Sequence, residues 1–415
     1  MIGLLLITSN AAASVADIYA VSSLVVVVGQ RSLLGLWIIE ALLALTFAMV
    51  MASVMRHVAP RRLLLATWLL AAAAYAVLGV VFLLGPRGGT TLVVLGIIDK
   101  LQVNVVYFAA WAYARELFNV DETVRYYGAI NAMSFFGSLA GTAVGGANLK
   151  SGLGPAPAMF GVAVLFVLGA IALGPLLKLA ARTPGEGAAA STTEAPEPEL
   201  RAVQLRAALG YIVRSPIFLC LALLGIANGC GYTVLEYEVI RRLAARTAGQ
   251  ADPLGGFGLL FAGLRVAQPL IYSMVELTIT SRLLRRVRVS RVFFSAPTAV
   301  TLSLALLGYA PSALLALAGS CLLQAAFAVE TQSVSGIVAG LAPDLRATVG
   351  VVATSIFYPI GYITGSALLW VGERLGGDLM RPTQLGVGLT AGLVALATAI
   401  RLNRTGVRLA FTDRR

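Results

Sequence analysis

Apolar runs of about 20 residues recur along this 415-residue chain, and they limit its possible folds more than any other feature. A helix of about 20 residues is long enough to cross the roughly 30 Å of hydrocarbon in a bilayer. Because lipid offers no hydrogen bonds to backbone N–H and C=O groups, only helices and closed β-barrels span a membrane. The runs lack the alternation of β-barrel strands. Hydrophobic residues make up 59% of the chain and charged residues 12%, about half the share in soluble domains. The sequence therefore predicts an all-α membrane protein.

We predict twelve transmembrane helices from these runs. They cover residues 2–28, 32–55, 62–84, 90–114, 123–148, 155–179, 216–241, 254–280, 290–309, 312–340, 346–372 and 382–401. The first run lacks a basic leader and a small-residue cleavage site, so we expect a retained helix and not a signal peptide. Loops on one side, with the C-terminal tail, hold 21 Lys or Arg residues, and loops on the other side hold 8, including Arg241, Arg242 and Arg246. This bias predicts that both termini are cytoplasmic.

Glycines recur every four residues in two of the predicted spans. Gly137, Gly141 and Gly145 lie on one face of the fifth span, and Gly361 and Gly365 lie on one face of the eleventh. Small residues at this spacing let two helix backbones approach closely inside a bilayer. The offset from Gly137 to Gly361 is 224 residues, and the offset from Gly141 to Gly365 is the same. The repeated offset indicates that the chain consists of two related halves.

A stretch rich in Pro, Ala, Ser, Thr and Glu lies between the halves, at residues 183–200. Such a composition cannot bury a core, so we predict a flexible cytoplasmic linker, followed by a short surface helix. The predicted domains are an N-terminal six-helix bundle (1–182), the linker with its surface helix (183–213) and a C-terminal six-helix bundle (214–415). Basic clusters that contain Arg62 and Arg286, also 224 residues apart, repeat between the halves. A six-plus-six repeat is typical of the major facilitator architecture.

Polar and ionisable side chains inside spans are costly, so we expect them to face a cavity or a partner. Lys100, Asn104 and Tyr107 follow the spacing i, i+4 and i+7, which places them on one helical face. Stripes in several spans define a candidate site for substrate binding or coupling: Asp17, Asp99, Lys100, Asn104, Tyr107, Tyr232, Arg265, Gln268 and Glu330. Hydrogen bonding between helices is the alternative role for such stripes.

The charged members of this set have two candidate roles each. Asp17, Asp99 and Glu330 suit proton coupling or the binding of a cationic group. Lys100 and Arg265 suit the binding of an anionic group or a switching ion pair. The aromatic side chains in the stripes are candidates for stacking on a ring of the solute.

The interior of the predicted helix bundle contains more acidic than basic residues. Its only basic residues are Lys100 and Arg265, whereas its acidic residues number seven: Asp17, Glu40, Asp99, Glu236, Glu238, Glu276 and Glu330. A carrier of ATP needs several cations for the phosphates. Glu236 and Glu238 lie near a helix end, where they either contribute to the site or are solvated rim residues.

Acidic residues followed by Arg mark the start of both glycine-rich spans. Asp121 and Arg125 stand at the start of the first, and Asp344 and Arg346 stand at the start of the second. Acidic residues at a helix start are ordinary caps. Because the pattern recurs in both halves, it also suits a cytoplasmic gate that opens and closes during transport.

Three segments resemble a known family. WAYARELFNVDETVRYYGAI (111–130), LTITSRLLRRVRVSRVFFSAP (277–297) and APDLRATVGVVATSIFYPIGYITGSAL (342–368) resemble segments of the plastid and intracellular-bacterial ATP/ADP translocases and their broader bacterial relatives. The resemblance implies a facilitator fold and nucleotide exchange by antiport. It also implies scaffold and gate roles for five matching side chains: Glu116, Asp121, Arg125, Tyr127 and Arg346. We expect an integral protein of a bacterial cytoplasmic membrane.

These features together predict a secondary active transporter of a small organic solute, working by alternating access and resembling nucleotide exchangers. A proton-coupled exporter of amphipathic or cationic compounds is an alternative, and a non-transporting membrane scaffold or sensor is another. The expected partners are the lipid bilayer, the solute (a nucleotide or an organic cation) and protons.

Other function classes find little support in the sequence. The three cysteines lie in apolar runs without metal-ligand spacing, and neither a nucleophile–base pair nor a glycine-rich phosphate loop stands out. We therefore predict no enzyme activity, no metal and no cofactor. The net charge of +12 is expected from loops that fix the topology, and we predict no nucleic-acid partner.

Overall fold

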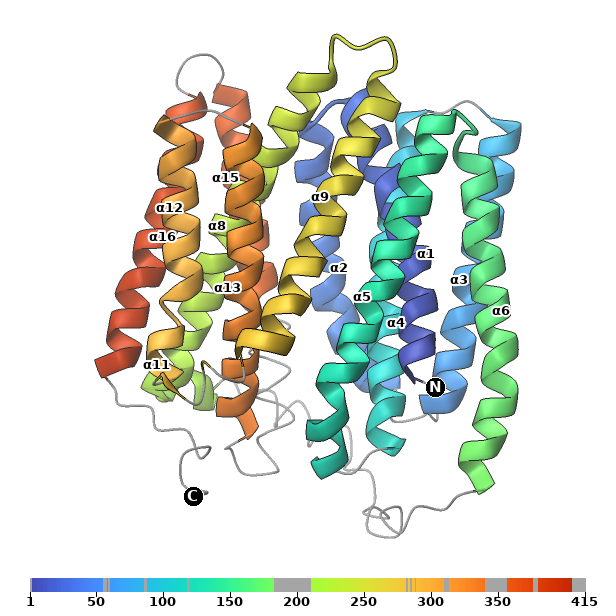
Figure 1. Cartoon of the computed structure of the whole chain (residues 1–415), viewed down its shortest axis with the longest axis horizontal. Coiled ribbons are helices and arrows are strands. Elements are labelled where there is room, and N and C mark those ends of the chain that lie inside the picture. The colour runs from blue at the N-terminus through green and yellow to red at the C-terminus, as the bar shows by residue number, and fades with distance from the viewer. Residues whose placement is uncertain are drawn as a thin grey trace. The chain divides into compact units, whose positions relative to one another are not determined.

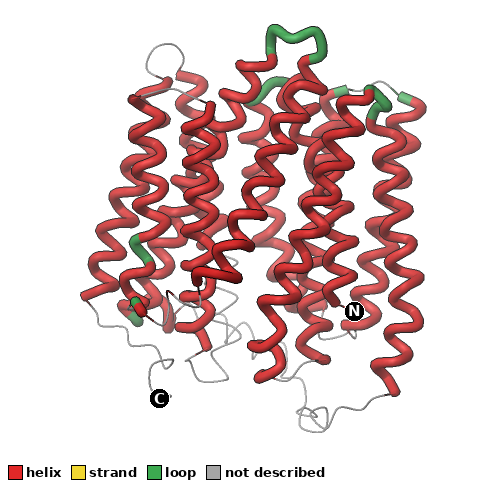
Figure 2. The backbone as a smooth tube through the Cα atoms, viewed as in Figure 1, coloured by secondary structure: helices red, strands yellow, loops and turns green. Residues whose placement is uncertain are grey.

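The computed structural model describes residues 2–54, 58, 60–85, 88–117, 120–182, 210–280, 283, 286–287, 289–309, 313–339, 357–375 and 380–404. Within these ranges the chain is helical and contains no strand (Figures 1 and 2). The predicted linker and most of the predicted surface helix lie outside them.

Six long helices come from the first half of the sequence. They are α1 (Ile2–Ser23), α2 (Arg31–Val54), α3 (Pro60–Leu84), α4 (Gly89–Leu117), α5 (Val120–Ser151) and α6 (Pro155–Arg182). A short π-helix, η1 (Leu24–Val28), extends α1. The second half contributes α8 (Pro216–Thr247), α9 (Pro253–Val275), the short α11 (Val289–Val292), α12 (Ser295–Tyr309), α13 (Ala313–Ala339), α15 (Phe357–Leu375) and α16 (Met380–Arg404). A second π-helix, η3 (Glu276–Thr280), extends α9.

In the described part of the chain, the twelve helices of 15 or more residues correspond one for one to the predicted spans. By length and composition alone, six helical segments of these described residues are able to cross a membrane: Gly3–Val28, Arg61–Leu84, Pro155–Gly174, Pro216–Thr247, Pro253–Ile279 and Gly386–Arg404. The eleventh predicted span is only partly covered, because its residues 346–356 are outside the described ranges and α15 begins at Phe357.

Two predicted boundaries were wrong. Helix α8 continues to Thr247, so Arg241, Arg242 and Arg246 are helical and not in a loop. Ion pairs from Glu238 to Arg241 and Arg242, three and four residues later, stabilise this extension. The ninth span is divided into α11 and α12, because Pro297 has no N–H to donate to the carbonyl four residues earlier.

The chain forms two compact units. Unit 1 comprises Met1–Leu36, Thr46–Ala195 and Leu243–Leu270, and unit 2 comprises Trp37–Leu45, Pro196–Arg242 and Ile271–Arg415. Helices α2, α8 and α9 therefore contribute residues to both units. A division of the chain at residues 182 and 214 remains a prediction.

The repeated glycines of unit 1 lie where α5 packs against α1. A Cβ atom at Gly137 would overlap the main-chain carbonyl of Ile7, and one at Gly141 would overlap that of Ala11. Only glycine permits this approach of the two backbones. In the described part of unit 1, α1 and α5 form the most extensive helix pair.

The glycines of unit 2 repeat this arrangement between α15 and α8. A Cβ atom at Gly361 would overlap the carbonyl of Ile226, and one at Gly365 would lie 3.0 Å from that of Cys230. Ile7 and Ala11 are each 219 residues before their counterparts Ile226 and Cys230, so the pairs match along both helices. The internal repeat predicted from glycine spacing is therefore confirmed by packing.

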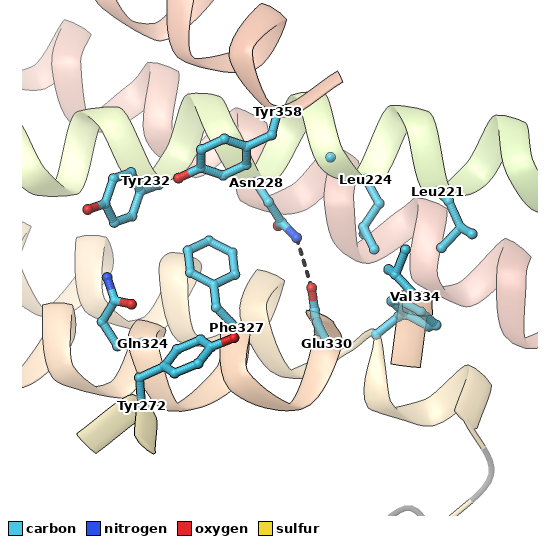
Figure 3. Close-up of a pocket in the computed structure, with 12 residues that line it drawn as sticks. Leu221, Leu224, Asn228, Tyr232, Tyr272, Gln324, Phe327, Glu330, Val334 and Tyr358 are labelled. Carbon is cyan, nitrogen blue, oxygen red and sulfur yellow. Dashed lines mark hydrogen bonds between the residues drawn. The ribbon is translucent and has the colours of Figure 1, made fainter. Parts of the chain in front are cut away.

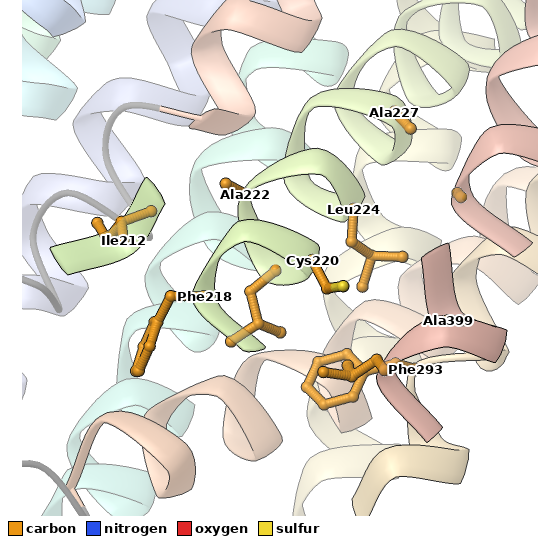
Figure 4. Close-up of a cluster of buried hydrophobic side chains, with 11 residues drawn as sticks. Ile212, Phe218, Cys220, Ala222, Leu224, Ala227, Phe293 and Ala399 are labelled. Atoms are coloured by element: carbon orange, nitrogen blue, oxygen red, sulfur yellow. The ribbon is translucent and has the colours of Figure 1, made fainter. Parts of the chain in front are cut away.

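Apolar packing surrounds the start of α8. Phe218 and Leu224 of this helix, Phe293 and Ala399 are members of a buried cluster (Figure 4). Elsewhere, large apolar side chains are exposed, for example Leu70 on α3. An exposed apolar surface on long helices is expected for contact with lipid.

Candidate functional site

Four of the predicted site residues form an ion cluster in unit 1. Asp17 of α1 lies between two cations: its Oδ1 is 2.8 Å from Lys100 Nζ of α4, and its Oδ2 is 3.2 Å from Arg265 Nε of α9. Lys100 Nζ is also 3.5 Å from Oδ2 of Asp99, which is fully buried. Two carboxylates and two cations balance formally, so both predicted cations already have anionic partners. Of the two roles predicted for Lys100 and Arg265, a switching ion pair requires such contacts, and the switching itself stays a prediction.

The guanidinium of Arg265 has further contacts along its own helix. Its centre lies 4.8 Å from the ring centroid of Phe261, and its Nη1 donates to Oε1 of the buried Gln268 at 3.4 Å. Phe261 and Gln268 are four residues before and three residues after Arg265, so all three lie on one face of α9. The stripe predicted on this span therefore holds the arginine against Asp17.

A polar chain that we did not predict connects three helices of unit 1. Tyr75 of α3 donates to Gln102 Oε1 at 3.4 Å, and Gln102 Nε2 donates to Ser9 Oγ of α1 at 3.3 Å. All three side chains are buried. Single polar residues in apolar runs form no stripe, which is why the sequence did not reveal this chain. Its contacts stabilise the pairing of α1 with α4, next to the ion cluster.

Unit 2 contains a cavity of about 380 Å³ (Figure 3). Aromatic and aliphatic side chains form most of its wall, and its polar lining residues include Asn228, Gln324 and Glu330. Helices α8, α9, α13 and α15 all contribute. The twelve lining residues, all within the described ranges, include one carboxylate and neither Lys nor Arg nor His. Its volume falls within the roughly 300–1,000 Å³ of small-molecule sites.

Three donors surround the carboxylate of Glu330, which is 6% exposed. Its Oε2 accepts from Asn228 Nδ2 at 3.2 Å, and its Oε1 accepts from the Ala296 N–H at 2.9 Å. Ser295 Oγ lies 3.3 Å from Oε1 and shares its single hydrogen between this oxygen and the Val292 carbonyl at 2.7 Å. The break between α11 and α12 positions two of these donors. Among the described residues, no Lys or Arg forms an ion pair with Glu330.

Aromatic rings continue from the cavity toward α2. Phe327 and Tyr358 line the cavity with ring centroids 6.1 Å apart, and Tyr232 lies 5.9 Å and 6.2 Å from them. Tyr362 then lies 6.3 Å from both tyrosines and 5.5 Å from Trp37 of α2. The contacts make one continuous column of rings within unit 2.

Glu236 and Glu238 are buried, so of the two roles that their position near a helix end suggested, that of solvated rim residues does not hold. They are 3% and 0% exposed. Glu238 is buried because Arg241 and Arg242 neutralise it at 2.9 Å and 3.3 Å. Glu236 lies close enough to Tyr362 for electrostatic interaction with its phenol, beside the aromatic column.

The remaining predicted residues lie outside what the structure describes. The side chains of Asn104, Tyr107, Glu116, Asp121 and Arg125 are not among the described ones, although their backbones belong to α4 and α5. Asp344 and Arg346 of the predicted gate lie outside the described ranges altogether.

Sequence reasoning missed Phe327 and Tyr358 of the cavity wall. Phe327 precedes Glu330 by three residues on α13, and Tyr358 precedes Tyr362 by four on α15, so both share a helical face with another site residue. That spacing was the available signal. Aromatic residues in apolar runs are common, however, and spacing does not distinguish a cavity wall from a lipid-facing surface.

Comparison with solved structures identifies the fold. The nucleoside transporter NupG matches with a TM-score of 0.69 and 12% identity over 98% of both chains. A POT family transporter in complex with 5-aminolevulinic acid matches with a TM-score of 0.65 and 13% identity over 96% of this chain and 94% of that one. An auto-inhibited POT family peptide transporter matches with a TM-score of 0.63 and 13% identity over 99% of this chain and 98% of that one. No family model and no curated protein matches the sequence significantly. The chain has the all-α fold of major facilitator-type membrane transporters.

Proposed function

We propose that this chain is a secondary active transporter that moves a small organic solute across a membrane by alternating access. One observation carries the proposal: helices of a facilitator fold enclose an aromatic-walled cavity of about 380 Å³ with a buried carboxylate. In this architecture the solute binds near the bilayer midplane and the halves rock around it. The non-transporting alternative, a scaffold or sensor, does not require such a cavity.

The ion cluster suits a contact that changes during the transport cycle. Asp17 and Lys100 come from the first half of the sequence, and Arg265 comes from the second half. In this proposal, Arg265 leaves Asp17 in one state of the cycle while Lys100 keeps the carboxylate neutralised. Protonation of Asp17, Asp99 or Glu330 would couple the cycle to a proton gradient.

Nucleotide exchange, which the resemblance to ATP/ADP translocases implies, is the narrower alternative. It requires Lys100 and Arg265 to release Asp17 before they bind phosphates, because both are already paired. One structural relative is named as a nucleoside transporter. Nucleosides carry no phosphate and therefore need no cation in the binding site, and their bases suit stacking on Tyr232 and Tyr358. Amphipathic or cationic solutes suit Glu330 directly.

We place the protein in a bacterial cytoplasmic membrane with both termini in the cytoplasm, since Lys and Arg favour that side. A green fluorescent protein fused after Arg415 is then fluorescent, whereas alkaline phosphatase at the same point is inactive. The reverse result would contradict this topology. We assign the cytoplasmic gate to Glu116, Asp121, Arg125, Asp344 and Arg346.

Solute counterflow in proteoliposomes tests the transport function. Vesicles that contain the purified full chain are loaded with unlabelled ATP, adenosine, an arylalkylamine or an organic acid, and uptake of the labelled solute is followed at two pH values. A transporter accumulates the labelled form of its own substrate transiently, while protein-free vesicles do not. Folded protein that moves none of the four classes at either pH would refute the proposal.

A further inference from the structure

We propose that the cavity of unit 2 binds a protonated amine on an aromatic or cyclic body, with the ammonium group in contact with both Asn228 Oδ1 and the carboxylate of Glu330. The inference extends the proposed transport function by naming the class of solute. The role of this binding in the cell rests on the proposed transport function, but the binding test below does not depend on transport.

The side-chain oxygen of Asn228 provides a buried acceptor without a partner in the described part of the chain. Asn228 is 5% exposed, and its Nδ2 donates to Glu330 Oε2, which leaves Oδ1 as the free end of the amide. Within the described part of the chain, this buried Oδ1 accepts no hydrogen bond. A buried polar atom without a partner is unfavourable, so a ligand that donates an N–H group there is favoured.

The carboxylate of Glu330 provides the charge. Its neighbours Asn228, Ser295 and Ala296 are neutral donors, and they use three of the roughly four acceptor positions of a carboxylate. A buried carboxylate is stabilised when a cation pairs with it. A primary ammonium group supplies a positive charge and three N–H donors, so it can donate to Glu330 and to Asn228 Oδ1 at once. A proton neutralises Glu330 but supplies a single O–H donor.

The aromatic wall accounts for the body of the solute. Figure 3 shows Tyr232 and Tyr358 on one side of the cavity, with Phe327 and Tyr272 opposite and Glu330 nearby. Ring faces attract a cation and also pack against an apolar or aromatic group. An anionic solute would meet Glu330 in a cavity whose lining residues carry no positive charge. The site therefore selects amines over phosphates and carboxylates.

Four probes that share a 2-phenylethyl group and differ in the polar end test this selectivity on the unmodified full chain. They are phenethylamine, trimethyl(2-phenylethyl)ammonium, 2-phenylethanol and 3-phenylpropionate, and binding is measured by calorimetry in detergent. We expect phenethylamine to bind about ten- to a hundredfold more tightly than the alcohol, as charged hydrogen bonds do. The quaternary probe, which lacks N–H groups, should fall between them, and the acid should not bind. Equal binding of the alcohol, or tighter binding of the acid, overturns the inference.

A pair of matched variants locates the site. Glu330→Gln should abolish the preference for phenethylamine over the alcohol, while Glu373→Gln, the same change at a buried residue outside the cavity, should keep it. Loss of the preference in both variants, or in neither, contradicts the assignment. If Glu330→Gln does not fold, the probe series on the unmodified chain still decides.

Separate measurements of binding and of counterflow distinguish the amine site proposed here from the proposed transport function. Selective binding of phenethylamine without counterflow of any solute supports the inference and refutes the proposed transport. Counterflow of another solute without selective binding of phenethylamine refutes the inference and leaves transport standing.

Discussion

Gly361 of α15 lies against the main-chain carbonyl of Ile226 on α8, with no room between the two backbones for a side chain. Gly361→Ala forces the helices apart and should destabilise the protein by about 1–3 kcal/mol, as overpacked sites do. The melting temperature of the purified chain measures this. Gly372→Ala on the same helix is the control, because a Cβ there meets nothing within 4 Å. The control should be neutral or stabilising, by up to about 1 kcal/mol. Equal effects of the two changes would contradict the close approach.

Asp17→Asn should destabilise the protein, because it leaves Lys100 and Arg265 without the carboxylate that they share. Removing one partner of a buried pair costs about 3–5 kcal/mol, and partial exposure makes this an upper bound. Denaturant titration measures the loss. The double variant with Arg265→Gln should recover part of the stability. The control Asp252→Asn, at an exposed residue, should cost much less than Asp17→Asn, because its amide oxygen can still accept the N–H of Gly255. A double variant as unstable as the two single variants combined would argue against the pairing.

Asp252 caps the start of α9. Its Oδ1 accepts the N–H of Gly255 at 2.9 Å, and Pro253 occupies the first helical position. Asp252→Ala should therefore cost about 1 kcal/mol in thermal unfolding. Asp252→Asn retains an acceptor and should restore most of the stability. The capping role is wrong if the two variants melt together.

Tyr237→Phe should cost about 1–3 kcal/mol, since Tyr237 donates to Glu373 Oε1 at 2.6 Å and both side chains are buried. Thermal unfolding again provides the measurement. Tyr211→Phe is the matched control, at a partly exposed tyrosine whose ring packs on Phe218. If the control loses as much stability, the hydrogen bond contributes nothing measurable.

Individual residues show which contacts the spacing of side chains can predict and which it cannot. The spacing of Gly137, Gly141, Gly361 and Gly365 was sufficient to predict close helix contacts, because a four-residue period defines one face of a helix. The partners Ile7 and Ile226 were not predictable, since any small or aliphatic residue could have stood opposite. The same holds for Asp17, whose charge was conspicuous in an apolar run but whose two partners were not.

The amino-acid sequence alone determined the helical membrane class, the duplication of the chain and the approximate ranges of the long helices, apart from the extension of α8 and the break before α12. Each follows from local hydropathy and from a repeated offset, both of which are properties of neighbouring or equally spaced residues. Only the tertiary structure decided that Lys100 and Arg265 share Asp17, that Asn228 contacts Glu330, and that Phe327 and Tyr358 form a cavity wall. The physical reason is that spacing defines which side chains share a helical face, whereas packing between helices decides what that face meets.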